Sequence, residues 1–359
     1  MARPVDFQKI RWERYPSVHR DPLARGWLER QALLGLAANT VDAYGRALQD
    51  FLSYCERCGN VAKAATREQI ALFVGDLRSR TGSHGKNTVR LDSGCSLSNA
   101  TLQQKLTAVR LFFDHLIEDG VRESNPVGRG RYTAGKAFGS PKGERGLLPR
   151  FKKLPWIPSE EQWRAFLDIA RTESIRNRLM IGLAYDAGLR REELCLLESE
   201  DIDPAYRLLR VRAETTKSGR ERRVPYSVIT GELLRLYLHQ RHSMSQRRGP
   251  LLLSESRRNW AAPISLWTWS KVMRRLACRA DLPQFSTHTL RHLCLTDLAR
   301  AGWELHEIAT FAGHRNLETT QQYIHLSGRE LAARIGEGME QLHARRILSL
   351  SSSEPGGKR

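Results

Sequence analysis

The sequence predicts a mainly α-helical protein of two domains, the second of which contains a small antiparallel β-hairpin. Three observations support this fold class. Apolar residues recur with the helical period of about 3.6 residues on both sides of residues 128–155. Residues 128–155 themselves are rich in glycine, proline and basic side chains, which is typical of a connecting segment. Residues 207–226 contain two short strand-like runs around a Lys-Ser-Gly turn, and these indicate the hairpin.

The composition restricts the classes of partner. The chain has 359 residues, with 58 Lys and Arg against 39 Asp and Glu, and a net charge of +19. Such an excess favours a polyanion, most commonly nucleic acid. The sequence has neither an apolar run of about 18 residues nor a secretory signal, so we expect a cytoplasmic, nucleoid-associated bacterial protein without a membrane partner. Cys55 and Cys58 lack the second pair that a zinc site needs, so we expect no metal and no other cofactor.

We expect residues 1–30 to form a polar arm and residues 31–127 to form a small helical domain. Apolar spacing predicts its first helix in residues 39–55. A second helix opens with the capping-box pattern TREQ at Thr66. A third runs from near Thr101 to Gly120.

The connector in residues 128–155 carries many cations against Glu144 alone. A one-sided charge of this kind suits a strap along a phosphate backbone, although an idle solvated linker would have the same composition. The candidate DNA contacts are these connector residues and two hairpin residues: Arg129, Arg131, Lys136, Lys142, Lys152, Lys153, Arg220 and Arg223.

The second domain is expected in residues 156–328. It opens with the helix SEEQWRAFLDIA, which Ser159 caps and which carries acids in its first turn, where the helix dipole favours them. Residues 329–359 are expected to form one more amphipathic helix and a flexible tail.

The stretch STHTLRH concentrates proton-exchanging and cationic side chains. If Ser286 or Thr287 caps a helix, His288, Arg291 and His292 share one helix face. Arginine cannot ligate a metal, whereas it gives phosphate a two-pronged hydrogen-bonding partner. The stretch therefore suits an anion site, and the ordinary alternative is a partly exposed basic face.

Three other fragments share this chemistry. GLRREEL places Arg190 at a helix start with Glu193 one turn later, and the hairpin presents Lys217 at its tip. AGHRNLETTQQY places Tyr323 nine residues after His314. Each fragment alone has a structural explanation as a salt bridge, a solvated lysine or a helix-face aromatic. In this order and spacing they form a specific set.

With these motifs the chain resembles the tyrosine recombinase family, also called phage-type integrases, over nearly its whole length. GLRREEL is similar to the first-arginine box, TTKSGRERRVP to the hairpin-lysine box, and HTLRH and AGH to the later boxes. Thr40, Tyr44 and residues 106–116 resemble the family's helical core-DNA-binding domain. Glu192, the long arm and the long connector depart from the compact Xer-like pattern and leave the subtype open.

The resemblance implies a catalytic fold in the second domain and a role for each matching residue. Arg190 and Arg291 would clamp the non-bridging oxygens of the scissile phosphate. Tyr323 would attack it, with its proton passing to His288. His314 would donate a further hydrogen bond, and Lys217 would protonate the departing 5′ oxygen. His292 matches no catalytic position, and we expect it to be a packed, hydrogen-bonded histidine.

The resemblance also implies partners and a function. The expected partners are double-stranded DNA at specific sites, three further protomers in a tetramer on paired sites, and accessory recombination proteins. The helix near residues 329–348 would dock on a neighbouring protomer or on its own domain. The expected function is strand exchange for integration, excision or transposition of a mobile element. The alternatives are an Xer-like dimer resolvase, a catalytically idle DNA-binding regulator and a type IB topoisomerase.

Overall fold

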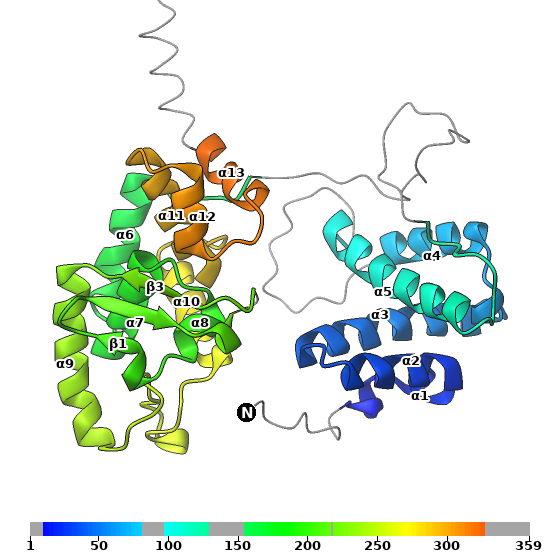
Figure 1. Cartoon of the computed structure of the whole chain (residues 1–359), viewed down its shortest axis with the longest axis horizontal. Coiled ribbons are helices and arrows are strands. Elements are labelled where there is room, and N and C mark those ends of the chain that lie inside the picture. Colours follow the sequence, from blue (N-terminus) through cyan, green and yellow to red (C-terminus); the bar gives the residue numbers. More distant parts are fainter. Residues whose placement is uncertain (1–9, 81–96, 129–153, 217, 327–359) are drawn as a thin grey trace, which may run out of the picture. The chain divides into compact units, whose positions relative to one another are not determined.

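The computed structural model describes residues 10–80, 97–128, 154–216 and 218–326. They belong to two compact units, which divide in the chain between Lys152 and Lys153 (Figure 1). Helices dominate both units, and the second contains a three-stranded antiparallel sheet, so the predicted fold class is confirmed. The expected C-terminal helix at residues 329–348 lies outside the described residues.

The first unit is built from helices around an aromatic core. Phe51, Phe73 and Phe113 meet edge to face, with ring centroids 5.3 and 5.7 Å from that of Phe51. The predicted capping box at Thr66 is present and starts the fourth helix. The helices are α1 (Pro16–Arg20), α2 (Pro22–Leu33), α3 (Ala38–Arg57), α4 (Arg67–Ser79) and α5 (Asn99–Glu118), with short 3₁₀ turns at Trp12–Arg14 and Ala62–Ala64.

The described part of the expected arm, residues 10–30, does not stand apart from this unit. Helices α1 and α2 lie within it, and Val18, Trp27 and Leu28 are buried in the same core as α3 and α5. The prolines that suggested an irregular arm occupy the first positions of both helices. Proline is compatible with that position because the first amide of a helix has no intrahelical acceptor.

The second unit surrounds a small sheet with eight helices in the described residues (Figure 1). The predicted hairpin is present, with Leu209 opposite Val224 and Val211 opposite Arg222. The sheet order is β1-β2-β3, where β1 (Ile202–Asp203) is an addition to the predicted pair β2 (Leu208–Val211) and β3 (Arg222–Pro225). The helices are α6 (Glu160–Ala170), α7 (Ile175–Asp186), α8 (Arg191–Cys195), α9 (Val228–Met244), α10 (Leu266–Arg279), α11 (Thr287–Arg300), α12 (Leu305–Ala312) and α13 (Glu318–Leu326), with 3₁₀ turns at Ser199–Asp201, Ala213–Thr215 and Arg257–Asn259.

Helix α7 is the central element of this unit. Its buried residues, including Leu179, Ile181 and Leu183, lie on all sides of the helix, as expected for a helix enclosed by its neighbours. It packs against α9 and α11. Its C-terminal end at Asp186 is therefore fixed in the core, and the motif GLRREEL follows directly. Among the described residues, none of the helices has both the length and the apolar character needed to cross a membrane.

Candidate active site

The motif GLRREEL forms a tight corner between α7 and α8. Gly188 has a φ of +54°, which favours glycine, and a Cβ atom there would lie 3.1 Å from the ring of Phe311. The corner places Arg190 at the N-cap of α8. Glu193 accepts hydrogen bonds from the Arg190 backbone N–H (2.9 Å) and from its Nη1 (2.7 Å). The local sequence thus fixes the orientation of Arg190.

Arg222 on β3 binds the other side of the same carboxylate. Its Nη2 donates to Glu193 Oε2 at 2.7 Å, and its Nε donates to the carbonyl of Phe311 at 2.9 Å. The Glu193 side chain is fully buried. Burial raises the pKa of Glu193, but hydrogen bonds and charge from Arg222, with Arg190, bring that pKa down to about 2. The buried carboxylate therefore stays ionised between two guanidinium groups.

Sequence reasoning named Arg223 and missed Arg222. Successive residues of a strand face opposite sides of the sheet, so residues two positions apart face the same side. Arg222 lies two positions before buried Val224, and this spacing was the available signal that Arg222 faces inward. Arg222 thus joins the cluster. Arg223 instead lines a pocket of about 350 Å³ with Glu200 and Asp203, among others. Arg220 is exposed in the turn between β2 and β3.

Arg291 lies one turn into α11, which begins at the Ser286 cap as predicted. Its side chain is buried, and its Nη1 and Nη2 donate to the carbonyls of Gly188 and Ala312. Arg190 Nη2 donates weakly to the next carbonyl, that of Gly313, at 3.5 Å. Both guanidinium groups therefore meet at one turn. Burial, with the charge of Arg190, lowers the pKa of Arg291 to about 10, so Arg291 remains charged near neutral pH.

His314 ends this turn, and its hydrogen bonds define its tautomer. Nε2 lies 3.0 Å from Arg291 Nη2, and Nδ1 lies 2.8 Å from Thr320 Oγ1. Because a guanidinium group only donates, Nε2 accepts and the hydrogen resides on Nδ1. Burial and the charge of Arg291 lower the pKa of His314 to about 3. Nε2 thus has no hydrogen for a phosphate in this arrangement, and the expected donation requires the ring to change tautomer or gain a proton.

Tyr323 on α13 is buried beside the arginine cluster. Its side chain is 2% exposed and packs with Cys294, Leu295, Ile308 and Ala312. Its hydroxyl oxygen lies 2.9 Å from Nδ1 of His292. Burial raises the pKa of Tyr323, and the positive charge of Arg291 offsets only part of that rise. The expected hydrogen bond of His292 is therefore present, and its partner is the hydroxyl of Tyr323.

The structure brings together five of the six predicted catalytic residues: Arg190, His288, Arg291, His314 and Tyr323. His288 lies one turn before His292, with the two ring centroids 5.7 Å apart, and it borders the cluster because burial and the charges of Arg291 and Arg190 lower its pKa. Lys217 lies outside the described residues, as do the candidate DNA contacts of the connector, Arg129, Arg131, Lys136, Lys142, Lys152 and Lys153. The carbonyl of Ser218, the residue after Lys217, accepts a hydrogen bond from Arg315 Nη2 at 2.6 Å.

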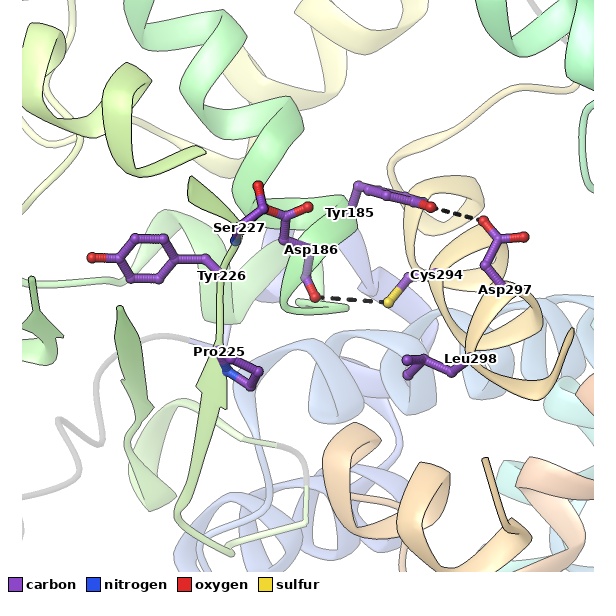
Figure 2. Close-up of a pocket in the computed structure, with 8 residues that line it drawn as sticks. All are labelled: Tyr185, Asp186, Pro225, Tyr226, Ser227, Cys294, Asp297 and Leu298. Carbon is purple, nitrogen blue, oxygen red and sulfur yellow. Dashed lines mark hydrogen bonds between the residues drawn. The ribbon is translucent and has the colours of Figure 1, made fainter. Parts of the chain in front are cut away.

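A separate pocket of about 410 Å³ lies between the end of α7, the end of β3 and α11 (Figure 2). Figure 2 shows the Tyr185 hydroxyl directed at Asp297, to which it donates at 2.8 Å. The lining residues include none of the predicted catalytic residues, so this pocket is not the candidate site. In the described part of the chain, no three His, Cys, Asp or Glu side chains are grouped closely enough to share a metal ion.

Comparison with known proteins identifies the family of the chain. Residues 158–330 match the model of the phage integrase family. A tyrosine recombinase XerC from Erythrobacter litoralis is 30% identical over 305 residues, which cover 84% of this chain and 87% of the relative. The chain belongs to the tyrosine recombinase family. A tyrosine recombinase XerD from Caulobacter vibrioides is 28% identical over 327 residues, covering 86% of this recombinase and 93% of the relative.

Solved structures share the fold of the recombinase. The Tn1549 transposon integrase in complex with a circular intermediate DNA gives a TM-score of 0.62 at 16% identity, covering 84% of this chain and 94% of that chain. XerH bound to a palindromic difH substrate also gives 0.62, at 19% identity, covering 91% of this chain and 94% of that chain. The family match and the XerC and XerD relatives identify the chain as a tyrosine-type site-specific recombinase.

Proposed function

We propose that this recombinase exchanges DNA strands through a covalent 3′-phosphotyrosyl intermediate on Tyr323, and that it integrates, excises or transposes mobile DNA. The observation that carries the proposal is the placement of Tyr323 beside the turn at Ala312–His314, whose carbonyls bind both Arg190 and Arg291. A pure DNA-binding regulator has no need of a buried tyrosine beside two fixed arginines.

The arginines supply the positive field that the reaction requires. A phosphodiester carries one negative charge, and in-line attack concentrates further charge on the non-bridging oxygens. Arg190 and Arg291 would bind those oxygens, and guanidinium groups already held by the protein need little reorganisation to do so. Glu193 and Arg222 contribute indirectly because they fix the orientation of Arg190.

The reaction conserves a phosphoester bond at each step. The Tyr323 oxygen forms a bond to phosphorus as the bond from phosphorus to the 5′ oxygen breaks, and Lys217 would protonate that oxygen. A 5′ hydroxyl of a partner strand then attacks the same phosphorus, and the bond between phosphorus and the Tyr323 oxygen breaks. The resemblance implies that His288 accepts the proton of Tyr323, whereas the partner of the hydroxyl in the structure is His292.

The proposed partner is duplex DNA at specific sites. Support comes from the net charge of +19 and from the structural relatives, the Tn1549 integrase and XerH, which were solved with DNA. We further propose four protomers on two paired sites, with the basic connector along the phosphate backbone and the helix near residues 329–348 docked on a neighbouring protomer. Accessory recombination proteins would act on that assembly.

An Xer-like dimer resolvase is the second candidate. The similarity to relatives named XerC and XerD over most of the chain favours it. The two candidates differ in the DNA that they cleave. Ends of the mobile element are substrates of an integrase, whereas a resolvase acts on one chromosomal or plasmid site and needs no element.

The covalent intermediate tests the proposal directly. Nicked duplexes from the ends of the genetic element and from chromosomal resolution sites would be incubated with the protein and separated on a denaturing gel. We expect a DNA-linked band that disappears in Tyr323→Phe, while the variant still binds the duplex. Tight binding without any adduct from the wild-type protein would contradict the proposal and favour the regulator.

A further inference from the structure

We propose that Arg315 positions Lys217 for proton donation to the departing 5′ oxygen, by holding the turn that carries this lysine. The inference rests on the proposed function, in which Lys217 is the acid, and it assigns Arg315 as a positioning residue. Lys217 itself lies outside the described residues. Its neighbours in the chain, Thr216 and Ser218, are described and show how the turn is held.

The turn between β2 and β3 is closed by Thr216. The Gly219 N–H donates to the Thr216 carbonyl at 3.3 Å, and the Arg220 N–H donates to Thr216 Oγ1 at 3.1 Å. Gly219 has a φ of +64°, a backbone conformation that residues with a side chain rarely adopt. The two ends of the turn are therefore fixed to each other on either side of residues 217–218.

Arg315 joins this turn to the stretch of backbone around His314. Its Nε and Nη2 donate to the carbonyl oxygen of Ser218 at 3.1 and 2.6 Å. Ser218 is buried although it lies in a hairpin turn, and its hydroxyl oxygen has no hydrogen-bond partner within the described residues. Arg315 thus holds the backbone of Ser218 and not its side chain. Because consecutive Cα atoms lie about 3.8 Å apart, a fixed Ser218 would confine Lys217 as well.

A second arginine ties the hairpin to the same stretch of backbone from the opposite direction. Arg222 on β3 donates from Nε to the carbonyl of Phe311 at 2.9 Å, and the carbonyls that bind both catalytic arginines follow directly. Arg222 also binds Glu193, whereas both hydrogen bonds that Arg315 forms with described residues go to Ser218. Loss of Arg315 should therefore release the turn and leave the arginine cluster in place.

The step that Arg315 supports is the departure of the 5′ oxygen. The Tyr323 oxygen forms its bond to phosphorus as the bond from phosphorus to the 5′ oxygen breaks, and the Tyr323 proton passes to His288. The electron pair of the broken bond stays on the 5′ oxygen, which takes a proton from Nζ of Lys217. An alkoxide is a poor leaving group, so an acid that is out of position slows this step. Arg315 acts on it only through the position of Lys217.

An exposed arginine could instead bind a DNA phosphate directly, and two substitutions separate these roles. Arg315→Gln loses the positive charge but keeps an N–H donor at Nε2, which occupies the same place along the side chain as Nε of arginine. Arg315→Met has a similar length and loses every donor. The tether predicts near wild-type activity for Arg315→Gln and a loss for Arg315→Met. Phosphate binding predicts equal losses in both variants and weaker binding of the duplex.

The leaving group provides the decisive measurement. Single-turnover adduct formation would be followed with saturating full-length protein on two nicked duplexes, one with the natural 5′ oxygen at the scissile phosphate and one with sulfur in its place. A thiolate leaves without a proton, so the sulfur duplex removes the need for an acid. On the oxygen duplex we expect Arg315→Met to be slower than wild type by about 10-fold, a part of what a general acid contributes. On the sulfur duplex this loss should largely disappear, as should the larger loss in Lys217→Ala.

Arg300→Ala is the charge control, because it removes an equal charge from an exposed ion pair at the far end of α11, and wild-type rates are expected on both duplexes. The Tm should stay near wild type, and Arg315→Leu replaces Arg315→Met if the latter unfolds. Equal losses in Arg315→Gln and Arg315→Met would overturn the assignment. Relief of Lys217→Ala by sulfur without relief of Arg315→Met would overturn it and leave the proposed function intact. Absence of an adduct from the wild-type protein, or a Lys217→Ala defect that sulfur does not relieve, would instead count against the proposed function.

Discussion

The two units of the recombinase are both helical and both have an apolar core, but they differ in the charges that they bury. The first is centred on aromatic rings such as Phe51 and Phe113, and it leaves ion pairs such as Arg20–Glu56 in solvent. The second buries Glu193 and Arg291. Buried charges are costly unless each is paired and hydrogen-bonded. The second unit also has a large apolar core, which includes Phe166 and Leu183, so the difference lies in the buried charges that it adds to that core.

The largest expected effect is on the packed unit. Phe51→Ala removes a fully buried ring that contacts two others and should destabilise the first unit by about 3–5 kcal/mol. Denaturant unfolding followed by tryptophan fluorescence would measure this loss. The exposed Leu72→Ala in the same unit is the control, with little expected change. Equal losses would contradict the view that aromatic packing organises this unit.

The matching change in the second unit removes one buried charge. Glu193→Gln leaves Arg222 and Arg190 without their anion and should cost about 3 kcal/mol. It should also slow adduct formation, because the orientation of Arg190 is no longer fixed. The control is Glu192→Gln, whose side chain is 47% exposed. Unfolding and single-turnover cleavage would be measured together, and a stable but inactive variant would show that Glu193 acts only on the site.

Acid should weaken the second unit through two histidines, whereas in the first unit burial lowers the pKa of His115. The pKa of His292 is lowered to about 4 and that of His314 to about 3, so the folded state binds fewer protons than the unfolded chain below about pH 6.5. Stability is therefore full above pH 6.5 and decreases as the pH falls towards 3. After allowance for solvent screening, we expect the two histidines together to lower the free energy of unfolding by about 2 kcal/mol. Unfolding of wild type and His314→Gln across this range would check the sign, and a stability that rises on acidification would refute it.

The smallest effects concern glycines. Gly313 has a φ of +64°, and a Cβ there would lie 3.1 Å from Arg222 Nη1, so Gly313→Ala should cost about 1–2 kcal/mol. Gly75 in α4 is exposed with open space around it, so Gly75→Ala should stabilise the first unit by about 0.5–1 kcal/mol. Thermal unfolding would measure both. If both substitutions changed the free energy of unfolding with the same sign, the contrast between the units would be weakened.

Local patterns predicted much of the fold because their causes lie within a few residues. The caps at Thr66, Ser159 and Ser286 each depend on a partner three residues or fewer away. The motifs around Arg190 and Arg291 also indicated an anion site before any geometry was known. By contrast, the prediction of an arm did not take into account that proline can begin a helix, as Pro16 and Pro22 do.

The remaining features depend on contacts between distant segments. Arg222 reaches Glu193 across 29 positions, and His292 reaches Tyr323 across 31. Neither pairing has a local signal, because it depends on how the strands and helices pack. His292 therefore looked like an ordinary buried histidine in the sequence, although its partner is the expected nucleophile.

The turn at Ala312–His314 has a consequence for timing. It joins α12 to the segment that leads to α13, and its carbonyls bind the two arginines expected to hold the phosphate. The nucleophile and the phosphate clamp are thus positioned from one short stretch of backbone. A displacement of α13 that moved this turn would also move the carbonyls that bind both arginines. The nucleophile and both arginines would then lose their positions together, as a single event.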